Sequence, residues 1–137
     1  MRAITVRQPH AWAIIHGGKD VENRSRNIAG SYRGPVAIHA GLAKFEQGGM
    51  SSEAHRRAHG SEVGTEIVFG ALIGVVDLVE VHDGNECNAG WLCSLWAMHD
   101  HQHLVLSNPR PLAKPISYKG ALGLWTLPDG VIPEASR

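Results

Sequence analysis

A long β-type segment at residues 67–82 constrains the fold of this chain more than any other part of the sequence. Val, Ile and Leu fill the segment, and Gly70 and Gly74 interrupt it. Aliphatic β-branched residues favour strands, and a glycine inside a long strand often marks a bulge or a barrel corner. The sequence therefore predicts a long, bent strand in a sheet that curls on itself.

Shorter segments predict further strands and two short helices. Apolar residues that alternate with polar ones, or that run together between turn signals, predict four more strands, at 3–7, 35–40, 104–106 and 121–125. A helix is expected after Pro9, because Ala11, Ile14 and Ile15 share one face and Gly17 follows them. A second, solvated helix or flap is expected at 53–59, after a capping Ser52.

The length and composition indicate one globular domain. The chain has 137 residues, of which 43% are hydrophobic and 19% charged, which is typical of a folded domain. We assign residues 1–127 to this domain and expect residues 128–137 to form a flexible tail. Two cysteines are too few for a disulfide framework, and no apolar run is long enough for a membrane span. We therefore expect a cytoplasmic protein with no membrane partner.

The charges are unevenly distributed along the chain. The formal net charge is zero, yet residues 1–34 contain six basic side chains and only two acidic ones, so this part carries +4 and the remainder −4. A neutral protein with a local basic region suits a small anion or a short single strand better than a long duplex.

Five segments in order resemble the signature of one protein family. They are QPHAWA at 8–13, GKDVENR at 18–24, RGPVAIHA at 33–40, NPRPL at 108–112 and KGALGLW at 119–125. Together they resemble the ASCH domain, and the resemblance extends over about residues 3–127. It implies an α+β fold, a small PUA-like open β-barrel of about six strands with flanking short helices.

The same resemblance implies a role with RNA. PUA-like domains include RNA-binding modules and readers of modified adenosine, and some ASCH proteins are hydrolases that act on acetylated cytidine or on RNA. A shared fold does not select among these activities. We expect an RNA or nucleotide ligand, no cofactor and no specific metal site; protein partners are not predicted.

Lys19, Glu22 and Arg24 form the central candidate site. The three residues lie within six positions, directly after the end of the expected helix. A lysine and an arginine bind phosphate well, and a carboxylate accepts hydrogen bonds from a base or a hydroxyl group. The alternative is a surface ion pair without function, which contributes about 0–1 kcal/mol.

Five further residues are candidates for the rim of a nucleic-acid cleft. Trp12 offers an aromatic face for a base, with core packing as its alternative. Tyr32 and Arg33 can stack on or clamp a nucleotide, or simply form a turn. His39 can face the cleft or be a satisfied core histidine. Gln8 offers a two-sided amide at the helix entrance.

A hydrolase using the same residues is the second hypothesis. Family members that cleave acetylated cytidine are thought to use a lysine, a threonine three residues later and a later glutamate; here the lysine is Lys19, but Glu22 occupies the threonine position. A Lys19–Glu22 pair remains suited to general acid–base catalysis on RNA. Among later acids, Asp77 and Glu80 are possible partners.

Two other sequence clusters suggest different roles. One crowds His99, Asp100, His101 and His103 downstream of the two cysteines, with His101 and His103 on one strand face, but no metal-binding spacing is present. The other supports a third hypothesis, a protein-interaction patch, with burial beneath a loop as its alternative. Its residues are Trp91, Leu92, Leu95, Trp96 and Met98.

Overall fold

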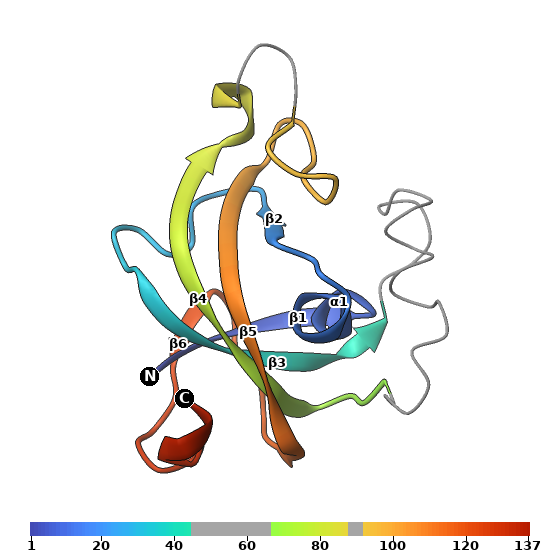
Figure 1. Cartoon of the computed structure of the whole chain (residues 1–137), viewed down its shortest axis with the longest axis vertical. Helices are drawn as coiled ribbons and strands as arrows, with labels where there is room; N and C mark the ends of the chain where they lie inside the picture. The colour runs from blue at the N-terminus through green and yellow to red at the C-terminus, as the bar shows by residue number, and fades with distance from the viewer. Residues whose placement is uncertain (45–66, 88–91) are drawn as a thin grey trace.

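A curled sheet of six strands dominates the structure, a computed structural model that describes residues 1–44, 67–87 and 92–137 (Figure 1). The order of the strands across the sheet is β2-β5-β4-β3-β1-β6. The strands are β1 (Arg2–Gln8), β2 (Val21–Arg24), β3 (Gly34–Lys44), β4 (Ala71–Asp83), β5 (Gln102–Ser117) and β6 (Leu124–Thr126). This sheet confirms the expected small, open, barrel-like fold of strands.

The helices of the described part are short. The α-helix α1 (His10–His16) follows Pro9, as the sequence predicts, and it lies beside β1 and β3 (Figure 1). Two single-turn 3₁₀ helices complete the set, η1 (Gly84–Glu86) and η3 (Glu134–Ser136). The helix expected at 53–59 lies outside the described residues. None of the described helices has the length and apolar character needed to cross a membrane.

The long predicted strand forms β4 and bends at the expected glycine. The pairing of β4 with both neighbouring strands shifts register between Leu72 and Gly74, which is the signature of a bulge. A Cβ atom at Gly74 would lie 2.6 Å from Cδ1 of Ile15 and 2.8 Å from the carbonyl oxygen of Arg110. Position 74 therefore needs glycine so that α1 can pack closely against the strand.

The strand predicted at 104–106 is much longer in the structure, because β5 continues through all three of its prolines to Ser117. The neighbouring strand β2 pairs with β5 only from Gln102 to Val105. Beyond this point β4 is the one described strand that pairs with β5. A proline is tolerated in such an edge region because its missing N–H group can face the side without a partner.

The main core fills the concave side of the sheet. Ile14 and Ile15 of α1 pack there against apolar side chains of β1, β3, β4 and β5. A second cluster on the other face includes Leu127 and Ile132. Ile132 is 2% exposed, so the segment 128–137, for which the sequence predicts a flexible tail, packs back against the sheet.

Candidate functional site

The polar segment after α1 folds inward rather than into solvent. Gly17 and Gly18 end the helix, and the backbone N–H of Lys19 donates to the carbonyl oxygen of Ala13 at 3.0 Å. The chain then enters β2, which pairs with the end of β5. Lys19 is 3% exposed and Glu22 is 8% exposed. Lys19 and Glu22 are therefore buried, whereas the side chain of Arg24 is 26% exposed.

Arg24 holds the Glu22 carboxylate and joins it to β1. Its Nε and Nη2 atoms donate to Oε2 of Glu22 at 3.2 and 3.0 Å, and Nη2 also donates to the carbonyl oxygen of Thr5 at 2.8 Å. Glu22 and Arg24 are two positions apart in one strand, so their side chains lie on the same face. The arrangement fixes one carboxylate oxygen and leaves the other without a described hydrogen bond.

The ammonium group of Lys19 lies against an aromatic ring. Its Nζ atom is 5.3 Å from the centre of the Trp96 ring, a distance at which a cation–π interaction forms. No hydrogen bond or ion pair found in the described part of the chain involves this ammonium group. Burial lowers the pKa of Lys19, and the nearby carboxylates of Glu22 and Asp20 only partly oppose this effect.

Trp96 reaches this position because its segment is bound to β2. The side-chain amide of Asn23 donates to the carbonyl oxygen of Trp96 at 2.9 Å and accepts from the backbone N–H of Met98 at 2.8 Å. The Ser94 hydroxyl also donates to the carboxylate of Asp20. Residues 92–98 therefore lie over the polar cluster of Lys19, Glu22 and Arg24. We call residues 92–98 the covering segment.

The hollow beside Glu22 is small and otherwise apolar. Its free volume is about 10 Å³, which is close to the space that one water molecule needs. A nucleobase does not fit this volume. The lining residues come from α1 and all six strands of the sheet, namely Ile4, Ile14, Glu22, Val36, Ile38, Leu78, Leu104, Leu106 and Leu124.

Gln8 and Trp12 make contacts within the protein that stabilise the fold. The amide oxygen of Gln8 accepts from the backbone N–H of Trp12 at 2.9 Å, and its amide nitrogen donates to the carbonyl oxygen of Val68 at 2.8 Å. Both ends of the amide are therefore engaged within the protein. Trp12 is 4% exposed and packs with Trp96 in a third core cluster, so its ring has no free face for a base.

The remaining rim candidates lie apart from the Lys19–Arg24 cluster. The hydroxyl of Tyr32 donates to the carbonyl oxygen of Pro35 at 2.7 Å, and the exposed Arg33 donates to carbonyl groups of its own turn. His39 is buried on the face of the sheet opposite Glu22, where its Nε2 lies 2.6 Å from the carbonyl oxygen of Tyr118 and its ring contacts Trp125. The structure does not bring these side chains together with Lys19.

The later acids proposed as catalytic partners also have other neighbours. Asp77 forms an ion pair with Arg110 at 3.0 Å, and hydrogen bonding from this guanidinium lowers the pKa of Asp77. The Glu80 carboxylate lies 3.6 Å from Nδ1 of His82. Among the described acids, the carboxylates of Glu22 and Asp20 influence the Lys19 ammonium.

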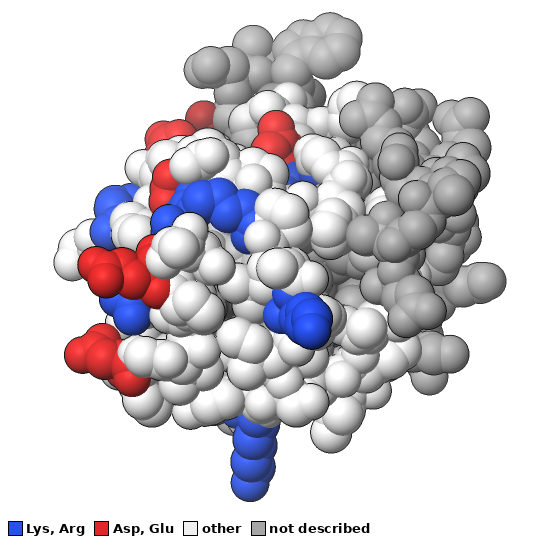
Figure 2. Space-filling view, turned by 60° about the horizontal axis from the view of Figure 1, so that its bottom comes forward, with Lys and Arg blue, Asp and Glu red and all other residues white. Residues whose placement is uncertain are grey.

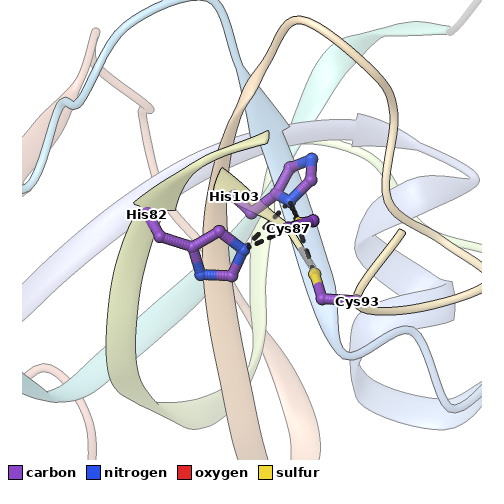
Figure 3. A group of neighbouring side chains, drawn as sticks. All are labelled: His82, Cys87, Cys93 and His103. Atoms are coloured by element: carbon purple, nitrogen blue, oxygen red, sulfur yellow. Dashed lines mark hydrogen bonds between the residues drawn. The ribbon is translucent and has the colours of Figure 1, made fainter. Parts of the chain in front are cut away.

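A second cluster, which sequence reasoning did not predict, lies where β4 ends and β5 begins. It contains His82, Cys87, Cys93 and His103, whose side-chain donor atoms all lie within 4.8 Å of one another (Figure 3). His82 and His103 are direct partners in the antiparallel register. Cys87 follows η1, and Cys93 belongs to the covering segment. We call these four residues the Cys₂His₂ cluster.

Each histidine of the cluster uses its other ring nitrogen outside the cluster. Nε2 of His103 lies 2.6 Å from the carbonyl oxygen of Met98, and Nδ1 of His82 lies 3.6 Å from the Glu80 carboxylate. Cys93 is exposed as a residue, yet partial burial of its thiol, followed by the hydrogen bond with Cys87, raises its pKa to about 11. A thiolate at this position would therefore need a neighbouring cation to stabilise its negative charge.

The Cys₂His₂ cluster overlaps only in part with the histidine-rich segment considered in the sequence analysis. His103 and the two cysteines belong to the cluster, whereas Nδ1 of His101 lies 2.7 Å from the carbonyl oxygen of His99 instead. His82 could not be recognised, because it joins the others only through the pairing of β4 with β5. The sequence signal available for this cluster was the pair of cysteines, the only two in the chain, which lie close to several histidines.

The suggested apolar interaction patch divides between core and surface. Trp96 is 7% exposed, whereas Leu95 is 69% exposed; Trp91 lies outside the described residues.

On the face shown in Figure 2, basic and acidic side chains lie close together and most of the described surface is uncharged. That face therefore carries no broad basic area of the kind that binds a duplex.

Fold and sites together define a small curled-sheet protein with a buried Lys–Glu–Arg group and a Cys₂His₂ cluster. Comparison with known proteins adds no closer assignment: no family model and no curated protein sequence matches the chain.

Proposed function

We propose that this protein binds a nucleotide unit of single-stranded or modified RNA, and that Lys19 contacts its anionic group. The observation that carries the proposal is the side chain of Lys19, which belongs to a residue only 3% exposed and whose ammonium group has an aromatic neighbour but no described hydrogen-bonding partner. The resemblance to the PUA-like ASCH domain supports the choice of RNA.

Physical chemistry supports an anionic ligand at Lys19. A buried charge is costly unless an opposite charge or hydrogen bonds compensate it. The Glu22 carboxylate is already held by Arg24, so it compensates Lys19 only in part. A phosphate or another anionic group beside the ammonium would supply the missing partner.

Glu22 and Arg24 have different roles in this proposal. The carboxylate oxygen of Glu22 that Arg24 does not hold accepts a hydrogen bond from a base or a sugar hydroxyl. Arg24 keeps the carboxylate in place through its bonds to Glu22 and Thr5. Because the hollow beside Glu22 has room for about one water molecule, entry of a nucleotide requires the covering segment to shift.

The charge of the protein indicates a short ligand. With a formal net charge of zero, long-range attraction to a polyanion is weak. A site with one or two phosphate contacts predicts a shallow salt dependence of the affinity.

Binding of a labelled single-stranded RNA oligonucleotide, measured by fluorescence anisotropy at several salt concentrations, tests the proposal. Lys19→Ala should weaken binding by about tenfold or more, because a hydrogen bond to a charged group contributes about 1.5–3 kcal/mol. Removing one phosphate contact should also lower the salt slope by about one. Lys114→Ala is the matched control, since Lys114 is exposed on β5.

Thermal unfolding of both variants establishes that they fold. Equal affinity of folded Lys19→Ala and wild-type protein for the RNA would exclude Lys19 as the anion contact. A loss of the same size in Lys114→Ala would show that binding depends only on overall charge.

Cleavage of RNA by transesterification in the same site is the second candidate, favoured by the lowered pKa of Lys19. In this scheme the Glu22 carboxylate accepts the proton of a 2′-hydroxyl group, whose oxygen attacks the adjacent phosphorus atom. The bond to the 5′-oxygen breaks, and the Lys19 ammonium protonates that oxygen. The products are a 2′,3′-cyclic phosphate and a 5′-hydroxyl end. A lowered pKa makes an ammonium a better proton donor.

Incubation with end-labelled RNA distinguishes cleavage from binding alone. Cleavage by the wild-type protein that is lost in both Lys19→Ala and Glu22→Gln supports the hydrolase. Binding without cleavage, at protein concentrations that saturate the RNA, supports the binding module.

A further inference from the structure

We propose that the Cys₂His₂ cluster is a structural zinc site that fixes the covering segment to the ends of β4 and β5. The ligands would be Nε2 of His82, Sγ of Cys87, Sγ of Cys93 and Nδ1 of His103 (Figure 3). The proposal concerns the metal alone, and its test needs no RNA.

The spacing of the donor atoms fits a tetrahedral ion. Zinc binds sulfur at about 2.3 Å and nitrogen at about 2.0–2.1 Å, so tetrahedral ligands lie about 3.3–3.8 Å from one another. Nδ1 of His103 lies 3.2 Å from Nε2 of His82, 3.3 Å from Sγ of Cys87 and 3.4 Å from Sγ of Cys93. Nε2 of His82 lies 3.2 Å from Sγ of Cys87.

Hydrogen bonding alone does not account for this convergence. Nε2 of His103 lies 2.6 Å from the Met98 carbonyl oxygen, which only accepts, so Nε2 carries the proton. Nδ1 of the neutral ring then has a single lone pair. Three donor atoms nevertheless converge on it within 3.4 Å. A cation bound by this lone pair and by the three other ligand atoms would satisfy all four groups at once.

The ligand set and its outer partners point to zinc. Two thiolates and two imidazoles in a tetrahedron select zinc among the common metal ions. Histidine ligands of zinc usually donate their second N–H to a carbonyl or carboxylate group, which orients the ring. Here the Met98 carbonyl and the Glu80 carboxylate lie at those positions.

Four protein ligands indicate a structural site. They complete the tetrahedron and leave no position for water or substrate, unlike a catalytic zinc. The ligands come from β4, from the residue after η1, from the covering segment and from β5. A zinc ion would therefore hold these four places in the chain together and would fix Cys93 only three residues from Trp96.

Metal analysis of the purified full chain tests this proposal. We expect about one zinc per chain and, after exchange for Co²⁺, the thiolate charge-transfer and visible bands of a tetrahedral cobalt site. Cys87→Ser and Cys93→Ser should each lose the stoichiometric metal and these bands. His99→Ala should keep both, because the exposed His99 is a nearby histidine outside the cluster.

If a cysteine variant fails to fold, measurements on the wild-type protein still test the proposal. Both thiols should react slowly with a thiol reagent until a strong chelator is added, and the chelator should lower the melting temperature until zinc is restored. Purified and zinc-supplemented protein with far less than one zinc per chain would overturn the proposal. Stoichiometric iron in place of zinc, or full retention of zinc in Cys93→Ser, would overturn it as well.

Discussion

The Lys19 ammonium lies 5.3 Å from the centre of the Trp96 ring, so a buried cation rests on the face of a buried indole. The two residues come from opposite halves of the chain, and Asn23 joins their segments through hydrogen bonds to Trp96 and Met98. Trp96 is also three residues from Cys93. The covering segment therefore supplies both the ring over Lys19 and one member, Cys93, of the Cys₂His₂ cluster.

Replacing Trp96 with leucine should raise the pKa of Lys19 towards its usual value. The smaller side chain admits water to the ammonium group and reduces the desolvation that lowers this pKa. NMR titration of the lysine amines in wild-type protein and Trp96→Leu measures the change. Trp125→Leu is the control, because Trp125 packs near His39 on the other face of the sheet. An unchanged Lys19 titration in Trp96→Leu would show that Trp96 does not shield the amine from water.

Arg24→Met should destabilise the protein by about 1–3 kcal/mol, because it leaves the mostly buried Glu22 carboxylate without its hydrogen-bonding partner. Glu22→Gln should then cost less in the Arg24→Met background than in the wild type. Chemical denaturation of the two single variants and the double variant gives this coupling energy. Additive effects would mean that the 3.0 Å ion pair contributes nothing to stability.

Gln8→Leu should lower the free energy of unfolding by about 2 kcal/mol or more. The leucine leaves the backbone N–H of Trp12 and the carbonyl of Val68 without their amide partner. Arg33→Ala, at an exposed turn position, should change stability by no more than about 0.5 kcal/mol. Denaturation curves compare the two variants, and similar values would contradict the structural role of Gln8.

His10 should make the protein less stable in mild acid. Burial, and then the Lys19 charge, lower the pKa of His10 from 6.5 to about 4. The unfolded state therefore takes up this proton more readily, so the stability contribution is fully present above pH 6.5 and is lost as the pH falls towards 4. The loss should approach about 3 kcal/mol.

Comparison of His10→Gln with the wild type isolates this effect from the titration of acidic groups. The stability of His10→Gln should fall less steeply over the same pH range, while the exposed His99→Ala should follow the wild type. Parallel curves for His10→Gln and the wild type would show that His10 is not responsible.

Gly84→Ala should weaken the proposed zinc site by about 10–100-fold. A Cβ atom at this position would lie 2.7 Å from the carbonyl oxygen of His101 and 2.9 Å from Nε2 of His103, so the ring would have to move. Competition with a chelator measures the zinc affinity. Asn85→Ala, an exposed change in the same 3₁₀ turn, should leave it unaltered, and equal affinities of both variants would refute the tight fit.

The periodicity of apolar residues predicted most of the described strands, because one face of each is buried. It also placed α1, since Ile14 and Ile15 form its buried stripe. It failed at β5, where prolines normally indicate a break. What permits Pro109 and Pro111 is that none of the described strands pairs with the other side of that part of β5, a property of the sheet rather than of the local sequence.

The candidate sites were predictable only where their residues are close in sequence. Lys19, Glu22 and Arg24 form one local pattern, and the structure buries the first two. Trp96 and His82 take their places through distant pairings, the first with Asn23 and the second with His103. A single sequence holds no record of such pairings, so neither the cover of Lys19 nor the fourth member of the Cys₂His₂ cluster could be found from it.

The position of β1 between β3 and β6 determines when the sheet can be completed during synthesis. Arg2 lies opposite Thr126, 124 residues later in the chain. One edge of β1 thus stays open until nearly the whole domain has left the ribosome. Because such distant contacts form slowly, the nascent chain must keep this early strand from associating with other chains until its last neighbour arrives.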